Sequence, residues 1–386
     1  MPHDHAAENT WNPIRAYRQR QSASREPRSY VLGLSPWKGF LRIWLAGETV
    51  VQWNRTLLRP KFYTFVAPAL RRRKGSKVYV WGYKIPAFVE AFCDRHGITL
   101  IRVEDGFLRS LALGATKAPP ISLCFDRGGM YFDATTPSDL EQILQTYDFA
   151  ADAPLLERAR RGIESLVASR LSKYNTSRDI DIASLYGPKT RTRILVVGQV
   201  EGDASILKGC DREIDNNDLV RVAAQENPDA QIIYKPHPEL LHGTRPYQSD
   251  PRDVRHLAMI LEEDITLADA FETVDRVYTI TSLSGFEALI RGIPVTCLGM
   301  PFYAGWGATD DRQLCPRRTA RRSTTEIFAA AYILYPRYFD PALRTELDFE
   351  GALALLAAMR EDRRSGREQG KPLAKPRLFS WLRRGR

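Results

Sequence analysis

Long apolar runs, paired cysteines and metal-ligand histidine spacings are all missing from this 386-residue sequence. Because it has no run of roughly eighteen apolar residues, no segment is predicted to cross a bilayer. The N-terminal region lacks the apolar core of a secretory signal, and the five cysteines show neither disulfide nor zinc-site spacing. These absences favour a protein of the reducing cytoplasm.

Acidic residues are the scarcer charged class: 46 Asp and Glu stand against 56 Lys and Arg, which leaves a formal net charge of +10. Hydrophobic residues make up 44% and charged residues 26% of the chain, as in a globular protein rather than a disordered one. The length predicts about two domains, each large enough for its own core.

The basic excess is concentrated in three segments, at 59–74, 316–322 and 360–386. Such patches attract polyanions, but no zinc finger, RNP-like motif or helix-turn-helix signature accompanies them, so nucleic acid is not a predicted partner. The stretch PRLFSWLRRGR at 376–386 mixes four apolar side chains with four arginines, which is typical of a segment at an anionic membrane surface. A solvated chain end is the alternative for this stretch.

Helical and strand-like patterns alternate along the chain, and they do so most regularly in its second half. There, short apolar strands are predicted at 193–198, 230–235, 276–280 and 294–299. Strands separated by helices form a parallel sheet with helices on both faces, so we expect an α/β fold. The polar bridge at 176–193 predicts the crossing between two domains.

Three polar clusters directly follow predicted strands of the second half: QVEGDAS (199–205), KPHPE (235–239) and TSLSG (281–285). In parallel sheets, ligands bind beyond the carboxyl ends of the strands. We therefore expect the fold to bring these clusters together. Their convergence predicts one binding site.

The clusters at 281–285 and 235–239 suit an anionic ligand. Hydroxyls and free backbone N–H groups at a helix start favour a phosphate, whereas an ordinary helix cap is the alternative. His237 lies between two prolines and near Lys235, where a cation would neutralise a leaving phosphate. A structural or solvated histidine is the alternative, and the spacing of the other histidines predicts no metal site.

Carboxylates follow two of the predicted strands. Asp203 and Glu201 suit nucleophilic or general-base chemistry, and a turn with a helix cap is the alternative. In the first half, Glu104 and Asp105 form a second carboxylate loop together with Arg109. If the two domains oppose each other, this loop faces the cleft and is expected to bind an acceptor or to supply a base.

Four motifs carry a family resemblance: VEDGFLRS (103–110), GQVEGDAS (198–205), YKPHPE (234–239) and TSLSGFEALIRGIPVTCLGMPFYAGWG (281–307). In this order they resemble the retaining β-Kdo glycosyltransferases of bacterial capsule polysaccharide biosynthesis and export. The resemblance covers residues 30–338. Larger members of that family carry two such modules in tandem, whereas this chain has room for one.

The resemblance implies a GT-B-like α/β fold with two Rossmann-like domains facing a cleft. We expect a flexible N-terminal segment (1–28), an acceptor-side domain (29–188), a CMP-sugar-binding domain (189–340) and a C-terminal helix with a basic tail (341–386). The implied activity is transfer of Kdo from CMP-Kdo to a lipid-linked Kdo or glycerophospholipid acceptor, without a further cofactor. The implied location is cytoplasmic and peripheral to the anionic inner membrane, with other capsule assembly or export proteins as further partners.

The same resemblance assigns roles to ten residues. Asp203 is the expected nucleophile, and Glu104 and Asp105 are the acid/base candidates on the acceptor side. Arg109 is expected to bind the substrate carboxylate. His237 is expected to act in catalysis and also belongs to the set that contacts the CMP donor, which is Gln199, Lys235, His237, Ser282, Ser284 and Glu287.

Two other functions are compatible with these motifs. One is a non-catalytic assembly or export factor that keeps the nucleotide fold and only binds lipid-linked glycan or scaffold partners. The other is a sialyltransferase-like inverting enzyme with a different CMP-sugar, which needs a general base in place of a nucleophile. A degenerate, non-catalytic member is expected to have lost Asp203 or His237, and both are present.

Overall fold

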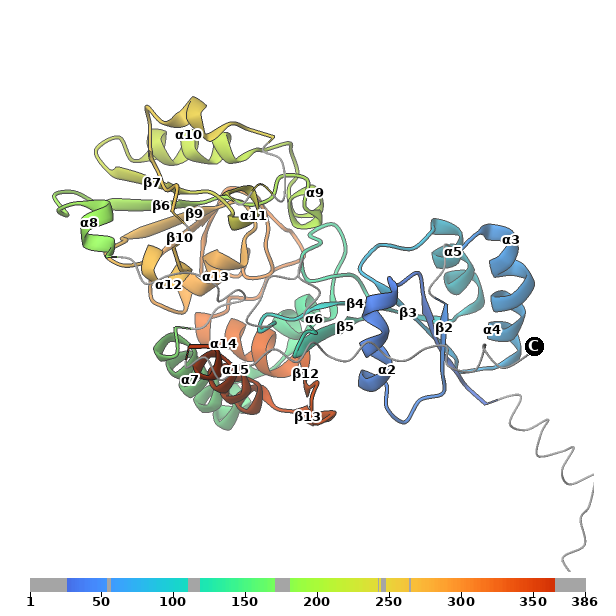
Figure 1. Ribbon diagram of the computed structural model, residues 1–386. Helices are drawn as coiled ribbons and strands as arrows, with labels where there is room; N and C mark the ends of the chain where they lie inside the picture. Colours follow the sequence, from blue (N-terminus) through green and yellow to red (C-terminus); the bar gives the residue numbers. More distant parts are fainter. Residues whose placement is uncertain are drawn as a thin grey trace, which may run out of the picture.

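Two β-sheets form the framework of the computed structural model (Figure 1). The structure describes residues 26–53, 57–109, 119–170, 181–241, 243, 248–263 and 265–364. The tail at 376–386, predicted to contact a membrane, and nearly all of the N-terminal segment predicted to be flexible lie outside the described residues. The architecture is the expected one, with two Rossmann-like α/β domains that face each other across a pocket.

The second sheet has the order β11-β10-β9-β6-β7-β8, and all of its described strand pairs are parallel. The central strand β6 is buried along its whole length, which explains the unbroken apolar run from Ile194 to Val197. All four strands predicted for this half are present. The bounds are β6 Arg193–Val197, β7 Gln231–Lys235, β8 Met259–Ile260, β9 Arg276–Thr279, β10 Val295–Cys297 and β11 Asp310–Asp311.

Helices cover both faces of the second sheet, with α10 on one face and α12 and α13 on the other (Figure 1). The start of α10 is fixed by a capping box, in which the side chains of Asp215 and Asp218 each accept from the other's backbone N–H. The helices are α8 Ile182–Tyr186, α9 Ala204–Gly209, α10 Asn216–Glu226, α11 Pro238–Leu241, η5 Pro251–Val254, α12 Leu267–Ala270 and α13 Leu283–Leu289.

The first sheet has the order β13-β12-β5-β4-β3-β1-β2. Its strands β1 to β4 pair in parallel, whereas β5, β12 and β13 pair antiparallel. The prediction placed residues up to 340 in the second domain, but β12 returns to the first sheet and pairs with β5. The bounds are β1 Ser29–Leu32, β2 Val50–Trp53, β3 Lys77–Trp81, β4 Thr99–Asp105, β5 Ser122–Asp126, β12 Pro336–Asp340 and β13 Thr345–Leu347.

A continuous helical run at 59–72 packs on the first sheet. Its buried side chains Phe62, Val66 and Leu70 share a core with Phe92 of the neighbouring helix. That helix ends at Gly97, whose φ of +60° suits glycine. The helical elements of this part are η1 Pro36–Phe40, α2 Leu41–Trp44, α3 Arg59–Lys61, η2 Phe62–Val66, α4 Ala67–Arg72 and α5 Ala87–His96.

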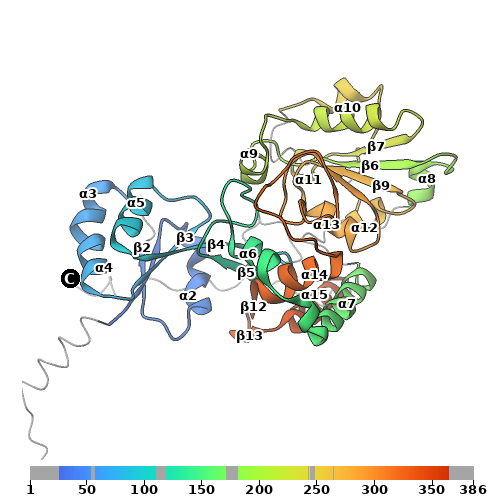
Figure 2. The same cartoon turned by 180° about the vertical axis from the view of Figure 1, so that it is seen from behind.

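A third group of helices lies against both halves, and α7, α14 and α15 are side by side in both views (Figures 1 and 2). One core cluster runs through this group and joins the halves: the rings of Phe107 and Phe302 lie 4.7 Å apart, and Phe328 stacks on Tyr332 at 4.6 Å. Trp306 is buried in the same core and donates from Nε1 to the carbonyl of Phe302 at 2.8 Å, so it belongs to a packed turn. The bounds are α6 Asp139–Thr146, η4 Phe149–Ala151, α7 Ala153–Ala168, α14 Thr324–Phe328, η6 Ala329–Leu334 and α15 Phe349–Arg364.

A buried ion pair fastens α6 to the long loop after β11. Arg318 donates from Nε to Glu141 Oε2 at 3.0 Å, and Arg317 donates to Glu141 Oε1 at 2.8 Å. Arg318 also donates to the carbonyls of Pro301 and Ala304. Since Glu141 and Arg318 are both buried, the carboxylate and the guanidinium depend on each other for compensation of charge.

Candidate functional site

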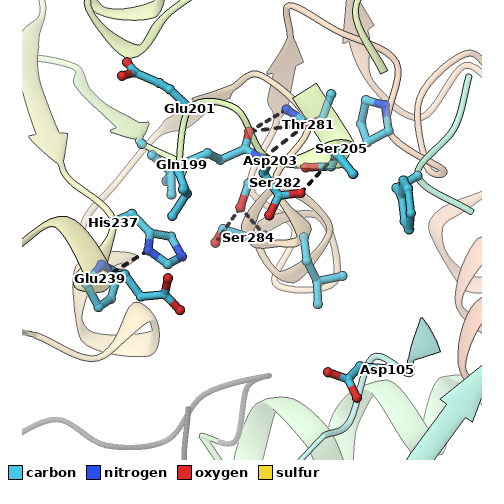
Figure 3. A pocket seen from close by; sticks show the side chains of 18 of the residues that line it. Asp105, Gln199, Glu201, Asp203, Ser205, His237, Glu239, Thr281, Ser282 and Ser284 are labelled. Atoms are coloured by element: carbon cyan, nitrogen blue, oxygen red, sulfur yellow. Dashed lines mark hydrogen bonds between the residues drawn. The ribbon is translucent and has the colours of Figure 1, made fainter. Parts of the chain in front are cut away.

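A pocket of about 760 Å³ lies between the carboxyl ends of β6, β7 and β9 and the end of β4 (Figure 3). The three polar clusters predicted to converge all line it, as does the carboxylate loop of the first domain. Nine of the ten predicted site residues are therefore brought together, and Arg109 is the exception. The geometry follows from the parallel order of the second sheet, in which neighbouring strands end at one edge.

The serine cluster starts α13 at one wall of the pocket. Ser282 is the N-cap, and its Oγ accepts from the backbone N–H of Ser284 at 3.2 Å and lies 3.1 Å from the Ser284 hydroxyl. The Tyr303 hydroxyl donates to the Ser282 carbonyl and so holds the turn in place. A Cβ at Gly285 would collide with that hydroxyl, so glycine is needed there. The cluster is a helix cap, which was the alternative interpretation of the sequence. Ser282 and Ser284 also line the pocket.

Gln199 ties two of the clusters to each other. Its Oε1 accepts from the backbone N–H of Thr281 at 2.7 Å, and its Nε2 donates to the Thr281 and Ser205 hydroxyls at 3.2 and 3.4 Å. Asn216 holds the backbone of Gln199 with two further hydrogen bonds of 2.9 Å. The buried Gln199 side chain therefore sets the distance between the loops after β6 and β9.

The histidine cluster is stiffened by the turn into α11. His237 Nδ1 accepts from the backbone N–H of Glu239 at 3.2 Å, so the neutral ring carries its proton on Nε2 (Figure 3). Lys235 is buried at the end of β7 and also lines the pocket. The cluster therefore offers the pocket an ammonium and an imidazole on a short, braced loop.

The two carboxylates after β6 have different surroundings. Glu201 is buried and accepts from the backbone N–H groups of Asn216, Gln248 and Ser249 at 2.8, 3.1 and 2.9 Å, so it holds neighbouring loops together. Asp203 is exposed to the pocket and caps α9, accepting from the N–H of Ser205 at 2.9 Å. Of this pair, only Asp203 presents its carboxylate to a ligand.

Glu104 and Asp105 face these clusters from the first domain, and Figure 3 shows Asp105 across the pocket from Asp203. The position of Arg109 differs from its predicted contact with substrate. Its guanidinium is buried and donates from Nε to Asp105 Oδ2 at 2.6 Å, so it holds the Asp105 carboxylate from behind. The backbone N–H of Asp105 donates to Glu104 Oε1 at 3.2 Å, and a glycine at position 82 leaves room for the Glu104 carboxylate.

Glu287 lies one helical turn after Ser284 on α13, where it is buried and lines the pocket. Arg291, one turn further on, donates to the backbone carbonyl of Glu287 at 2.7 Å. Burial lowers the pKa of the Arg291 guanidinium, and the Glu287 carboxylate opposes that shift. This acidic end of the pocket is the one predicted to meet ribose hydroxyls.

Lys38 is a charged residue near the site that the sequence motifs do not include. It is buried, and its Nζ lies 2.8 Å from the centroid of the Trp81 ring, which lines the pocket. Burial lowers the pKa of its ammonium to about 7, while the carboxylates of Glu104 and Asp105 oppose the shift. A lone lysine in a short helical turn gives no signal in the sequence, because its burial depends on packing against β3 and β4.

We expect the stability of the wild type relative to Lys38→Met to increase with pH. The unfolded chain keeps the Lys38 proton up to its ordinary pKa of 10.5, whereas the folded chain releases it near pH 7. Between these values the unfolded state binds one more proton, so wild-type stability rises by about 1.4 kcal/mol per pH unit relative to the variant. Urea unfolding of both proteins at several pH values from 7 to 9 measures the slope, and a difference in stability that stays constant would contradict the lowered pKa of Lys38.

None of the helices that the structure describes is both long and apolar enough to span a membrane. Within the described ranges, no group of three or more His, Cys, Asp and Glu side chains is placed to hold a metal ion. The pocket contains cations from both domains, namely Lys84 after β3 and Lys235 at the end of β7. These two charges suit a ligand with more than one negative group.

Comparison with known proteins assigns this chain to a family. The model of the family described as capsule polysaccharide biosynthesis protein matches residues 76–338. The lipopolysaccharide-processing protein LpsZ of Rhizobium meliloti is 44% identical over 336 residues, which are 87% of this chain and 76% of LpsZ. The capsule polysaccharide modification protein LipA of Neisseria meningitidis serogroup B is 39% identical over 316 residues, but these cover only 44% of LipA.

Two solved structures share the fold over most of the chain. The β-Kdo 2,4-transferase of Thermosulfurimonas dismutans KpsC is 32% identical, with a TM-score of 0.71, and the match covers 86% of this chain and 98% of that one. The β-Kdo 2,7-transferase of the same KpsC is 33% identical, with a TM-score of 0.66, covering 86% and 99%. By its sequence and its fold, this chain belongs to the capsule polysaccharide biosynthesis protein family.

Proposed function

We propose that this protein is a retaining β-Kdo glycosyltransferase that transfers Kdo from CMP-Kdo to a lipid-linked Kdo or glycerophospholipid acceptor. The observation that carries the proposal is the opposition, across one pocket, of Asp203 with the serine and histidine clusters to Glu104 and Asp105. The similarity to two KpsC domains named as β-Kdo transferases supports the choice of sugar. Peripheral attachment to the cytoplasmic face of the inner membrane is part of this proposal.

The donor would bind against the second sheet. The hydroxyls of Ser282 and Ser284 and the ring of His237 surround the space proposed for the CMP phosphate, and Glu287 would accept from ribose hydroxyls. Lys84 and Lys235 supply positive charge for the two anionic groups of CMP-Kdo, its phosphate and its sugar carboxylate. Arg109, which is buried and donates to Asp105, has no part in this proposed contact.

In the first step, a carboxylate oxygen of Asp203 forms a bond to the anomeric carbon of Kdo. The bond from that carbon to the phosphate oxygen breaks, and its electron pair leaves with CMP, whose charge Lys235, His237 and the serine hydroxyls stabilise. The result is an ester between Asp203 and Kdo. This step inverts the anomeric centre once.

In the second step, an acceptor hydroxyl attacks the same carbon and releases the Asp203 carboxylate. A carboxylate on the acceptor side, Glu104 or Asp105, takes the hydroxyl proton. Two inversions restore the original configuration, as in retaining glycosidases that use a carboxylate nucleophile. Arg109 keeps Asp105 in place during this transfer through its hydrogen bond.

The proposal is tested by incubating the purified protein with an in situ CMP-Kdo generating system and a short synthetic Kdo-terminated acceptor. We expect a mass increase of one Kdo in the product, and a Kdo adduct on Asp203 by mass spectrometry when a poor acceptor traps the intermediate. Product without an adduct, together with inverted configuration by NMR, would contradict the retaining mechanism and favour an inverting transfer of Kdo with a general base. CMP binding without transfer would refute Kdo transfer to that acceptor, and loss of CMP binding as well would favour the non-catalytic factor.

We expect transfer activity to survive chelation. In the proposed mechanism Lys235, His237 and the serine hydroxyls take the charge of the departing phosphate, so no divalent cation is required at that step. Initial rates with and without EDTA, using donor supplied free of its generating enzyme, provide the measurement. A complete loss of turnover that added Mg²⁺ or Mn²⁺ reverses would contradict this prediction.

A further inference from the structure

We propose that the outer face of the helical run through α3, η2 and α4 docks on an anionic lipid bilayer. Three large apolar side chains on it are exposed to solvent: Leu58 by 51%, Tyr63 by 43% and Phe65 by 62%. They lie within eight residues of sequence, whereas the other large exposed apolar side chains of the described chain are scattered over its second half. A cluster of this kind on a water-facing helix indicates an interaction surface.

The inner face of the same run already explains how the helix is held. Phe62, Val66 and Leu70 are buried against α5 and the first sheet in a continuous core. One edge of the outer face also packs inward, since the Tyr63 ring lies 6.0 Å from that of Phe92 and the Phe65 ring lies 6.5 Å from that of Trp53, yet all three outer side chains keep 43% or more of their surface exposed. Their exposure calls for a separate explanation.

The charge of this part of the chain selects an anionic partner. From residue 49 to residue 89 there is no Asp or Glu and there are nine Lys and Arg, although 46 of the 386 residues are acidic. Of the two flanking carboxylates, Glu90 pairs with Arg102 outside the stretch, and Glu48 pairs with Lys77 of β3, which leaves the cations of the helical run without an acidic neighbour in the sequence. Exposed cations flank the apolar side chains at Arg59 and Lys61, and Arg71, Arg72 and Lys74 are exposed at the far end of the same helical run.

Basic residues mixed with exposed aromatic and aliphatic side chains fit the interface of a bilayer with anionic head groups. The apolar side chains enter the boundary between head groups and acyl chains, while arginine and lysine contact lipid phosphates. A second copy of this chain is a poorer fit, because it would bring two cationic surfaces together.

The topology places the start of this helical run at the same sheet edge as the carboxylates proposed to act on the lipid acceptor. The run follows β2 and leads into the parallel strand β3, so its start, with Leu58, Tyr63 and Phe65, lies at the carboxyl edge of the first sheet. Glu104 and Asp105 lie at that same edge. Figures 1 and 2 both show α3 and α4 at the end of the molecule away from the second sheet, so docking there leaves the proposed donor site uncovered. The link between this docking face and a lipid acceptor rests on the proposed function.

Sedimentation of the full-length protein with vesicles tests the surface itself. We compare phosphatidylcholine vesicles with vesicles that contain phosphatidylglycerol, using the wild type, Leu58→Ser/Phe65→Ser and Arg59→Gln/Lys61→Gln. The matched controls are Leu314→Ser/Leu343→Ser, at exposed apolar sites elsewhere, and Arg160→Gln/Arg161→Gln, at exposed cations of α7. We expect the wild type and both controls to bind anionic vesicles, the apolar variant to lose about tenfold and the charge variant about thirtyfold in affinity.

Several outcomes would overturn docking through this face. They are absent binding to anionic vesicles, equal binding by patch and control variants, or a wild-type dimer in solution that the patch variants abolish. Transfer to a short water-soluble acceptor separates this proposal from the proposed function. Transfer without vesicle binding removes only the docking surface, whereas vesicle binding through the patch without any transfer removes only the proposed enzyme activity.

Discussion

Replacing Asp203 by asparagine is expected to lower kcat/KM for Kdo transfer by at least about a thousandfold and to leave CMP affinity within about threefold of the wild type. The amide has no anionic oxygen to attack the anomeric carbon. It still caps α9, because asparagine accepts from a helix N-terminus as well as aspartate does. The measurement is a steady-state rate together with calorimetric titration of CMP.

Because Asp203 caps a helix as well as facing the pocket, two alanine variants are needed to separate an effect on catalysis from an effect on folding. Asp203→Ala removes both functions, whereas Asp181→Ala removes only an equivalent cap, at the start of α8 and outside the residues that line the pocket. We expect Asp181→Ala to retain wild-type turnover. An Asp203→Asn variant that keeps more than about a tenth of the activity would rule out the nucleophile assigned here.

Replacing Glu141 by alanine is expected to lower the free energy of unfolding by about 3–5 kcal/mol. The substitution leaves the buried Arg318 guanidinium without its carboxylate partner, and only the carbonyls of Pro301 and Ala304 remain to receive its hydrogen bonds. Urea unfolding followed by tryptophan fluorescence measures the change.

The control for this prediction is Glu157→Ala. Glu157 also pairs with two arginines, but it lies on an exposed turn of α7, where ion pairs contribute at most about 1 kcal/mol. Equal effects of the two substitutions would show that the Glu141 pair contributes no more than a surface pair.

Local patterns in the sequence predicted the second sheet and the convergence of its loops. β6, β7, β9 and β10 are short apolar strands between helices, so their parallel order and the edge at which Asp203, His237 and Ser282 meet follow from general rules of α/β folds. The family resemblance inferred from four motifs is confirmed by the family match and the related structures.

Other features depend on contacts between distant segments, which local patterns do not encode. The pairing of β12 with β5 joins segments far apart in the chain, so the predicted boundary at residue 340 was wrong. The burial of Arg109 and Lys38 results from packing around β3 and β4. Glu201 was a candidate base by its position, but its carboxylate accepts three backbone hydrogen bonds and holds neighbouring loops together. The position of a charged residue in a motif therefore does not show whether its side chain faces the pocket or the protein interior.

The return of β12 to the first sheet also bears on how the chain is made. Synthesis runs from the N-terminus, so β5 emerges from the ribosome long before the strand that covers its edge. Until β12 follows, after the entire second sheet, this edge offers unpaired backbone groups to other chains. The domain that begins first is therefore completed last, and a fragment ended between the two sheets would carry an open, aggregation-prone edge for its whole lifetime.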